Sequence, residues 1–206
     1  VYKLLQDEQM WDYSIRWAEH NQWMGATEPD ASKWKYKNYG GGPEYVLFGD
    51  WQICFQTYID LFAIAPEEKK IYRAIEVMNY EADSEDNDYW WWADALYMVM
   101  PVMTKMYWLT GDVKYLNKLY ANILYTDSIM LDKETGLYFR DGKYVYPNHK
   151  TASGKKDFWA RGDGWVLAGL AKVLQDMPET YVHQPFFVEK YINLARAVQK
   201  LQQPEG

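Results

Sequence analysis

Aspartate 94 is the residue whose surroundings most clearly suggest chemistry. It follows three consecutive tryptophans, residues 90–92, and precedes an apolar stretch that is expected to be helical. A carboxyl group among indole rings loses hydration, which disfavours its charged form and raises its pKa. A carboxylic acid that keeps its proton near neutral pH is suited to general acid catalysis. The alternative interpretation is that Asp94 only caps the helix, as acids often do in a first turn.

A second acid, Asp50, lies in the segment 49–58, which also leads from a long loop into a predicted helix. Asp50 is either a helix cap or the second carboxylate of a catalytic site. In the second case its charge would help to keep Asp94 protonated, and it would position a water molecule. Asp94 and Asp50 are therefore the catalytic candidates.

The segment 158–165 supplies a candidate anion site. Arg161 lies between Trp159 and Trp165, and the two glycines that flank Asp163 allow close backbone approach. A guanidinium group binds a planar carboxylate with a fork of donors, and an indole ring can stack beside it. In the alternative interpretation, Arg161 caps a carbonyl or pairs with an acid, and the tryptophans belong to the core.

The composition favours a carbohydrate ligand. The 206 residues include 11 Trp and 19 Tyr but only 7 Phe, and the Trp and Tyr rings combine a flat apolar face with a polar edge.

The net charge of −7 argues against nucleic acid as the main partner. The single cysteine, Cys54, excludes an internal disulfide and a cysteine-based zinc site. No stretch of 18 apolar residues occurs, so we predict no membrane-spanning helix, while a cytoplasmic and a periplasmic location fit equally well.

No metal or cofactor motif is present. The three histidines show no ligand spacing, and we expect His149 and His183 to be solvated. The chain has no helical His-Glu metal motif, glycine-rich phosphate loop or serine nucleophile elbow. The acidic run 83–88 departs from the spacing of an EF-hand calcium loop, so a solvated loop is the preferred interpretation. We therefore predict no metal and no cofactor.

The elements that must position these residues are helices. Apolar periodicity and Pro or Gly breaks predict about seven of them, near residues 5–23, 50–64, 66–80, 92–109, 113–130, 162–177 and 185–203. Short connections alternate with long ones, which is typical of helical hairpins stacked around an axis. A closed barrel of six hairpins needs twelve helices, or roughly 300 residues. We therefore expect an all-α fold in which residues 1–206 form one incomplete domain, the N-terminal portion of an (α/α)6 barrel.

Four blocks in the same order resemble glycoside hydrolase family 105. They cover residues 90–98, 109–116, 135–141 and 158–170. This family comprises the unsaturated rhamnogalacturonyl hydrolases and is related to the unsaturated glucuronyl hydrolases of family 88. The resemblance implies an (α/α)6 barrel, here without its C-terminal helices, and a reaction that needs no cofactor. The implied partner is an oligosaccharide whose non-reducing end is a 4,5-unsaturated uronic acid, left by a polysaccharide lyase.

The resemblance also implies roles for particular residues. The reaction would be hydration of the enol ether, with Asp94 of the Ala-Asp-Ala-Leu block as acid and base and Asp50 as the second carboxylate. The positions that hold the uronate carboxylate and the sugar ring would be Trp159, Arg161 and Trp165. We add Trp92 and Arg140 to the substrate-binding residues, since Arg140 lies where many members place a histidine. Asp163 stands where the motif more often has asparagine, which brings an extra negative charge close to the expected uronate.

Two other functions remain to be distinguished. One is a non-catalytic carbohydrate-binding protein that has kept the aromatic cleft. The other is a different (α/α)6 enzyme, such as a sugar epimerase, which would use a histidine pair as acid and base. The three histidines here lie outside the motif blocks, which argues against the epimerase.

Overall fold

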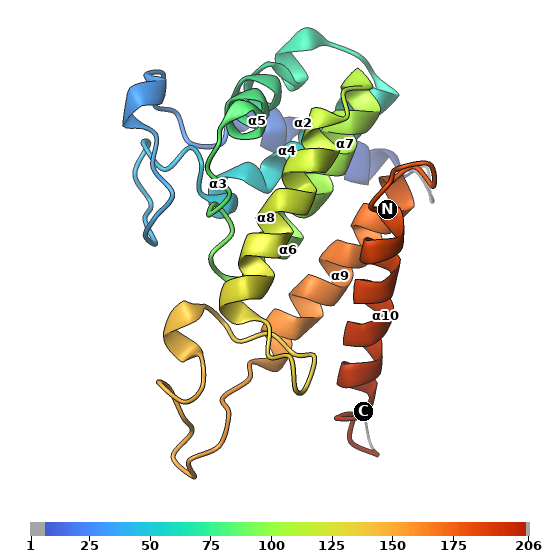
Figure 1. Cartoon of the computed structure of the whole chain (residues 1–206). Coiled ribbons are helices and arrows are strands. Elements are labelled where there is room, and N and C mark those ends of the chain that lie inside the picture. The colour runs from blue at the N-terminus through green and yellow to red at the C-terminus, as the bar shows by residue number, and fades with distance from the viewer. Residues whose placement is uncertain (1–6, 205–206) are drawn as a thin grey trace. The chain divides into compact units, whose positions relative to one another are not determined.

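The computed structural model describes residues 7–204, and within this range the regular structure is entirely helical. Among these residues, extended backbone pairs only at two isolated bridges, Trp92 with Asp141 and Leu131 with Tyr138. The chain divides into two compact units, Val1–Asp83 and Ser84–Gly206. Figure 1 shows the elements of both units by label, and each unit is described by itself below. No helix within the described residues is long and apolar enough to cross a membrane.

The first unit is built around helix α4. Its helices are α2 (Glu8–His20), α3 (Gly49–Gln52), α4 (Cys54–Ile64) and α5 (Tyr72–Asp83), with 3-10 turns at Ala31–Lys33 and Glu68–Lys70. Helix α4 packs against both α2 and α5. The fully buried Tyr58 of α4 meets the ring of Trp23 edge-on at 5.3 Å and donates a hydrogen bond to the Met24 carbonyl at 3.0 Å. The long loop after α2 is therefore held to the core from its first residues onward.

A buried arginine fixes the next part of that loop. Arg73 of α5 is 3% exposed and donates to the carbonyls of Ala26 and Glu28, both at 2.9 Å. Its guanidinium also donates to the carboxylate of Glu76 at 2.6 Å. A buried guanidinium must satisfy its donors, so these bonds fix the loop in one path.

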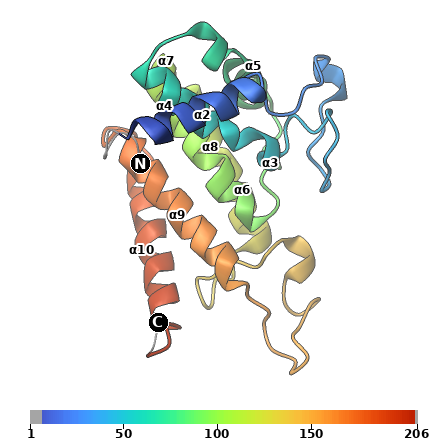
Figure 2. The same cartoon turned by 180° about the vertical axis from the view of Figure 1, so that it is seen from behind.

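The second unit contains the remaining helices: α6 (Ala93–Met98), α7 (Met100–Thr110), α8 (Lys114–Met130), α9 (Ala160–Asp176) and α10 (Gln184–Gln199). A 3-10 turn covers Gly142–Tyr144. Helix α9 packs against α6, α7 and α10, and α10 runs along α9 in both views (Figures 1 and 2). Because α9 packs against three other helices, its first turn is held in a fixed position relative to α6.

The seven predicted helices are confirmed, with three of them divided, although residues 5 and 6 of the first lie outside the described residues. The stretch 66–80 begins with the 3-10 turn Glu68–Lys70, and its α-helix, α5, starts only at Tyr72. The stretch 50–64 breaks at Ile53 into α3 and α4, and the stretch 92–109 breaks at Val99 into α6 and α7. Pro101 explains the second break, because proline lacks a backbone N–H and is tolerated only in a first turn. Gly111 ends α7 in the left-handed conformation, with φ of 72°. In the connection between α8 and α9, Tyr138 pairs with Leu131 in an isolated bridge, and the 3-10 turn Gly142–Tyr144 follows.

Two glycines of α9 offer a matched test of this packing. A Cβ added to Gly169 would lie 2.6 Å from the backbone oxygen of Leu96, whereas one added to Gly164 would meet nothing within 4 Å. We expect Gly169→Ala to destabilise the protein by about 1–3 kcal/mol, since α6 must move away. Gly164→Ala should stabilise it by about 0.5–1 kcal/mol, since alanine loses less backbone entropy in a helix. Chemical denaturation of the two variants measures the difference, and equal effects would show that α6 and α9 do not pack closely.

Candidate active site

Helix α6 begins at Ala93, directly after Trp92, which has extended backbone and forms the N-cap. Asp94 is the second residue of this helix. Its side chain is half-buried, and burial raises the pKa of the Asp94 carboxyl. A hydrogen bond from its own backbone N–H and the charges of Arg140 and Arg161 act in the opposite direction, but the net shift is upward. Asp94 is thus a carboxylic acid that holds its proton more tightly than usual while two cations lie close enough to influence it.

Arg161 reaches this position from the first turn of α9. Its guanidinium carbon lies 4.4 Å from the centroid of the Trp159 ring, and the side chain is exposed. Gly162 lets the two helix starts approach, because an added Cβ would lie 2.8 Å from the Trp159 ring and 3.4 Å from the Cβ of Ala93. An exposed guanidinium stacked on an indole keeps its outer N–H groups available for an anion.

Trp165 continues the aromatic surface one turn further along α9. Its ring lies 4.7 Å from that of Tyr97 on α6, at an interplanar angle of 40°. The ammonium group of Lys172 lies 4.9 Å from the Tyr97 ring. Trp165 and Tyr97 are both partly exposed, so this pair offers flat surface beside Arg161. Tyr97 was not among the predicted site residues, although its place in the Ala-Asp-Ala-Leu-Tyr block is a signal for it.

Arg140 comes from the long connection between α8 and α9. Its backbone carbonyl accepts the N–H of Ala93 at 2.8 Å, which places Arg140 beside the start of α6. Its Nη1 donates to the hydroxyl of Tyr144 at 3.2 Å and lies 3.7 Å from Oδ2 of Asp141. The structure therefore places Asp94, Arg140, Arg161 and Trp159 in one neighbourhood.

Trp92 differs from its predicted role. Its side chain is 2% exposed, and its ring packs against that of Trp91 at 4.8 Å. Trp90 is also buried, at 1% exposed, and its carbonyl accepts a hydrogen bond from Thr126. Trp92 has no open face for a sugar in this structure, and Trp91 is the partly exposed ring of the three. The run of tryptophans is thus mainly core that supports Asp94.

Asp50 belongs to the first unit, in the first turn of α3. Its exposed side chain lines a cavity of about 370 Å³ whose walls include Trp17, Trp51 and Tyr58. Gly25 is required here, because an added Cβ would lie 2.0 Å from the Trp51 carbonyl oxygen. Asp50 therefore lies at an indole-walled hollow, and its pairing with Asp94 stays a prediction.

Asp163 turns away from the exposed surface of α9. It is 3% exposed, and its Oδ1 accepts the backbone N–H of Tyr138 at 2.8 Å. Burial raises the pKa of the Asp163 carboxyl to about 6, and the hydrogen bond from Tyr138 lowers it to a smaller extent. The extra negative charge that the sequence places next to Arg161 is thus directed into the protein.

The acidic loop before the tryptophans is organised by a lysine. The Lys118 ammonium, 5% exposed on α8, donates to the carbonyls of Ser84 and Asp86 and to the side-chain oxygen of Asn87. An ammonium group thus occupies the position that a cation would take, and the loop is anchored rather than simply solvated. Among residues 7–204, no three His, Cys, Asp or Glu side chains are grouped so as to hold a metal ion.

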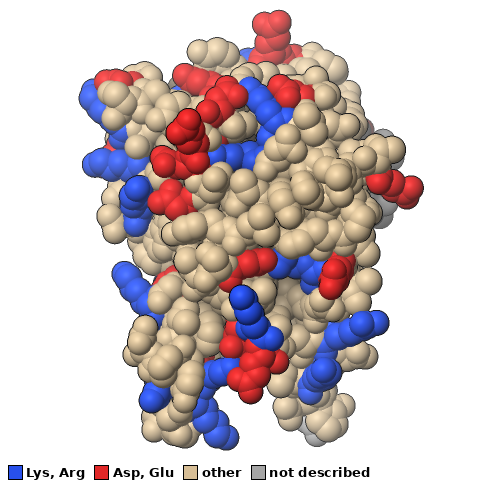
Figure 3. All heavy atoms as spheres, viewed as in Figure 1, with Lys and Arg blue, Asp and Glu red and all other residues tan. Residues whose placement is uncertain are grey.

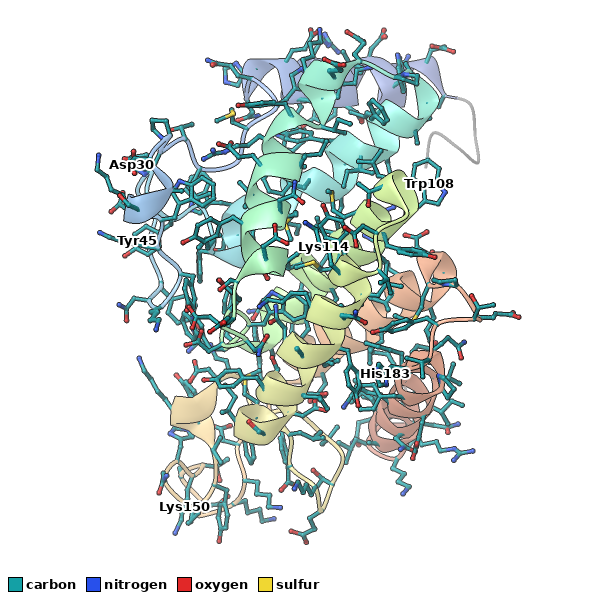
Figure 4. The ribbon with its side chains drawn as sticks, turned by 45° about the horizontal axis from the view of Figure 1, so that its top comes forward. Asp30, Tyr45, Trp108, Lys114, Lys150 and His183 are labelled. Atoms are coloured by element: carbon teal, nitrogen blue, oxygen red, sulfur yellow. The ribbon has the colours of Figure 1, made fainter. Side chains whose placement is uncertain are left out.

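Two histidines expected to be solvated have partners. His149 lies 2.7 Å from the Asp157 carboxylate, and its ring contacts that of Tyr144 at 4.6 Å. The ring of His183 stacks on Tyr120 at 3.8 Å, beside helix α10 (Figure 4). Neither contact has a signal in the local sequence.

Positive charge gathers near Arg140 in the loop of residues 142–158. Lys143, Lys150 and Lys155 are exposed there, and Lys and Arg side chains cluster at the lower left of Figure 3, over this loop. Lys150 lies in the part of the loop far from the helices (Figure 4). In a chain with a net charge of −7, this local excess of cations favours an anionic ligand at the loop.

Several known proteins are similar to this chain. A curated relative from Formosa agariphila, named unsaturated 3S-rhamnoglycuronyl hydrolase, is 37% identical over 121 residues, 57% of this chain and 32% of that protein. A solved structure described as a polysaccharide lyase is 57% identical, with a TM-score of 0.96 over 99% of this chain and 57% of that one. A second, described as a family 88 glycosyl hydrolase from Bacteroides vulgatus, is 51% identical, with a TM-score of 0.96 over 99% of this chain and 58% of that one.

A more distant structure shares the fold alone. It is a family 105 glycoside hydrolase from C. acetobutylicum, 20% identical, with a TM-score of 0.72 over 98% of this chain and 57% of that one. The chain thus has the helical-barrel fold of these enzymes and spans a little over half of the solved structures and about a third of the curated relative. The model of Glycosyl Hydrolase Family 88 matches residues 1–206, and the chain belongs to that family.

Proposed function

We propose that the protein removes a 4,5-unsaturated uronic acid from the non-reducing end of lyase-generated oligosaccharides. The observation that carries this proposal is the setting of Asp94: burial raises its pKa, while Arg140 and Arg161 lie near it. An acid with a raised pKa and two cations near it suits a substrate that carries a carboxylate and must accept a proton on carbon.

The reaction proposed is hydration of the enol ether. Asp94 donates its proton to C4 of the double bond, and positive charge develops at C5 and the ring oxygen. Water adds at C5 and loses a proton to the carboxylate that Asp94 has become, so the acid is regenerated. The hemiketal then opens to a ketone at C5, and the hemiacetal at C1 releases the remaining oligosaccharide as an alcohol. Each turnover consumes one water and leaves no net change of oxidation state.

The remaining residues have positioning roles in this proposal. The guanidinium of Arg161 binds the uronate carboxylate, and the indoles of Trp159 and Trp165 contact the sugar ring. Arg140 contributes a second positive charge, held by Tyr144. Asp50 is proposed to position the attacking water, as the second carboxylate of the site.

We further propose that the sugar next to the uronate is of the rhamnogalacturonan, or pectin, type. The curated relative is named for a rhamnoglycuronyl substrate, which supports a rhamnose-linked uronate in general terms. The cationic loop 142–158 supports an acidic oligosaccharide over a neutral one.

The direct test follows the double bond. Full-length protein incubated with lyase-cleaved rhamnogalacturonan should abolish the ultraviolet absorbance of the unsaturated uronate and release a 4-deoxy-5-keto uronate. The same oligosaccharide without a double bond serves as control and should not be cleaved. A rise in absorbance on intact polysaccharide would instead indicate a lyase, the description given to the 57% identical structure. Binding by calorimetry with no change in absorbance would indicate a non-catalytic carbohydrate-binding protein.

A further inference from the structure

The buried carboxylate of Asp163 connects two parts of the candidate site. Asp163 lies in the first turn of α9, two residues after Arg161, and is 3% exposed. Its Oδ1 accepts the N–H of Tyr138, 25 residues earlier in the chain, at 2.8 Å. This bond joins the helix that carries Arg161 to the segment that carries Arg140.

Residues 138–141, called the strap here, are held along their length. The N–H of Phe139 donates to the Met130 carbonyl at 2.9 Å, which fixes the strap to the end of α8. The Arg140 carbonyl accepts the N–H of Ala93 at 2.8 Å, which fixes it to the start of α6. A bridge between Asp141 and Trp92 continues this pairing. Asp163 supplies the bond to α9 at the other end of the strap.

The strap therefore sets the separation of the two arginines. Arg140 lies within the strap. Arg161 lies two residues before Asp163, which anchors the strap to α9. Ala93, which bonds to the strap from α6, directly precedes Asp94. Both arginine charges act on the Asp94 carboxyl. A shift of the strap would move Arg140 relative to Arg161 and change both substrate binding and the protonation of Asp94.

The chemistry of Asp163 fits an anchor rather than a substrate contact. A buried carboxylate is costly, and burial raises the pKa of Asp163 to about 6. The carboxylate is retained at this cost and accepts one backbone N–H from a segment with no regular secondary structure. An asparagine oxygen would accept the same N–H, which makes asparagine the conservative replacement.

We propose that Asp163 is a positioning residue that, through the Tyr138 N–H, holds the strap so that Arg140 and Arg161 are correctly placed around Asp94. This inference rests on the proposed function for its kinetic consequences. It assigns Asp163 no contact with the substrate.

The test compares Asp163→Ala with Asp163→Asn in the full-length protein. We expect Asp163→Ala to lower kcat/KM by about tenfold to a hundredfold, the effect of misplacing a binding group by about 1 Å. The alkaline limb of its pH profile should move to higher pH, because displaced arginines no longer lower the pKa of Asp94. Asp163→Asn should have the wild-type rate and the wild-type alkaline limb of the pH profile. Gly164→Ala, next in sequence with open space around it, is the matched control.

Three results would overturn the proposal: an unchanged Asp163→Ala enzyme, an equal loss in both variants, or a loss with the pH limb unmoved. If Asp163→Ala does not fold, Asp163→Ser carries the same comparison, because its hydroxyl is too short to reach the Tyr138 N–H. Calorimetric titration with glucuronate separates this inference from the proposed function, since it needs no turnover. If wild type shows no turnover but binds glucuronate, and Asp163→Ala weakens that binding, the strap proposal stands and the hydrolase proposal fails.

Discussion

Replacing Asp94 by asparagine is expected to lower kcat by about a hundredfold to ten-thousandfold, the usual contribution of a general acid. The amide has nearly the same size and keeps the hydrogen-bonding position at the start of α6, but it has no proton to give to C4. KM should change much less, since Arg161 and the indoles remain. The measurement is the rate at which lyase-generated oligosaccharide loses its double-bond absorbance.

Glu179→Gln is the matched control for the lost charge. Glu179 is exposed just beyond the C-terminal end of α9, at the opposite end from Arg161, and its replacement should leave the rate unchanged. An Asp94→Asn protein that folds normally and keeps the wild-type kcat would exclude Asp94 as the proton donor.

The pH dependence of the wild type follows from the same residue. Only the protonated form of Asp94 is active, so the rate falls as pH rises through the pKa of Asp94. Because burial raises this pKa, activity extends to higher pH than an ordinary aspartate would allow. The alkaline limb that belongs to Asp94 should be absent from the residual activity of Asp94→Asn.

Much of the fold was predictable because helix signals are local. Apolar periodicity, Pro101 and Gly111 mark where helices begin and end, and these residues act on their own neighbours. Asp94 and Arg161 were also predictable as partners, since each lies where a long connection leads into a helix. The break at Ile53 is a detail that the apolar pattern does not reveal, because the pattern continues through it.

The burial of Trp92 could be predicted from the spacing of residues 90–92, although not from the amino-acid composition. In extended backbone, residues two apart lie on the same face, so Trp90 and Trp92 are expected to share one environment. Trp90 and Trp92 are buried, and Trp91 between them is partly exposed, which follows this alternation. A sequence reading that treats residues 90–92 as extended rather than as the start of a helix would have selected Trp91.

The bond from Tyr138 to Asp163 had no such signal. It joins residues 25 positions apart, one of them in a segment without periodicity. The sequence shows Asp163 only as an unexpected charge beside Arg161, and its direction depends on how α9 meets the strap. Long-range contacts of this kind require the packed structure, because no local pattern encodes them.

Arg161→Ala is expected to raise KM for the unsaturated substrate by about tenfold to a hundredfold. Hydrogen bonds to charged groups contribute about 1.5–3 kcal/mol, and each 1.4 kcal/mol corresponds to a factor of ten. Competition assays with glucuronate and with glucose isolate the carboxylate: affinity for glucuronate should fall, and affinity for glucose should change little. Arg161→Lys should lie between wild type and alanine, because lysine keeps the charge but loses the planar fork that stacks on Trp159.

Arg196→Ala provides the control, since Arg196 is exposed near the end of α10 and its loss changes the net charge by the same amount. Arg161→Ala should also move the alkaline limb of the pH profile upward, because the Arg161 charge lowers the pKa of Asp94. Arg196→Ala should leave both affinities and the limb as in wild type. Equal weakening of glucuronate and glucose binding by Arg161→Ala would mean that Arg161 shapes the cleft without binding the carboxylate, and the uronate would then have to be recognised by Arg140.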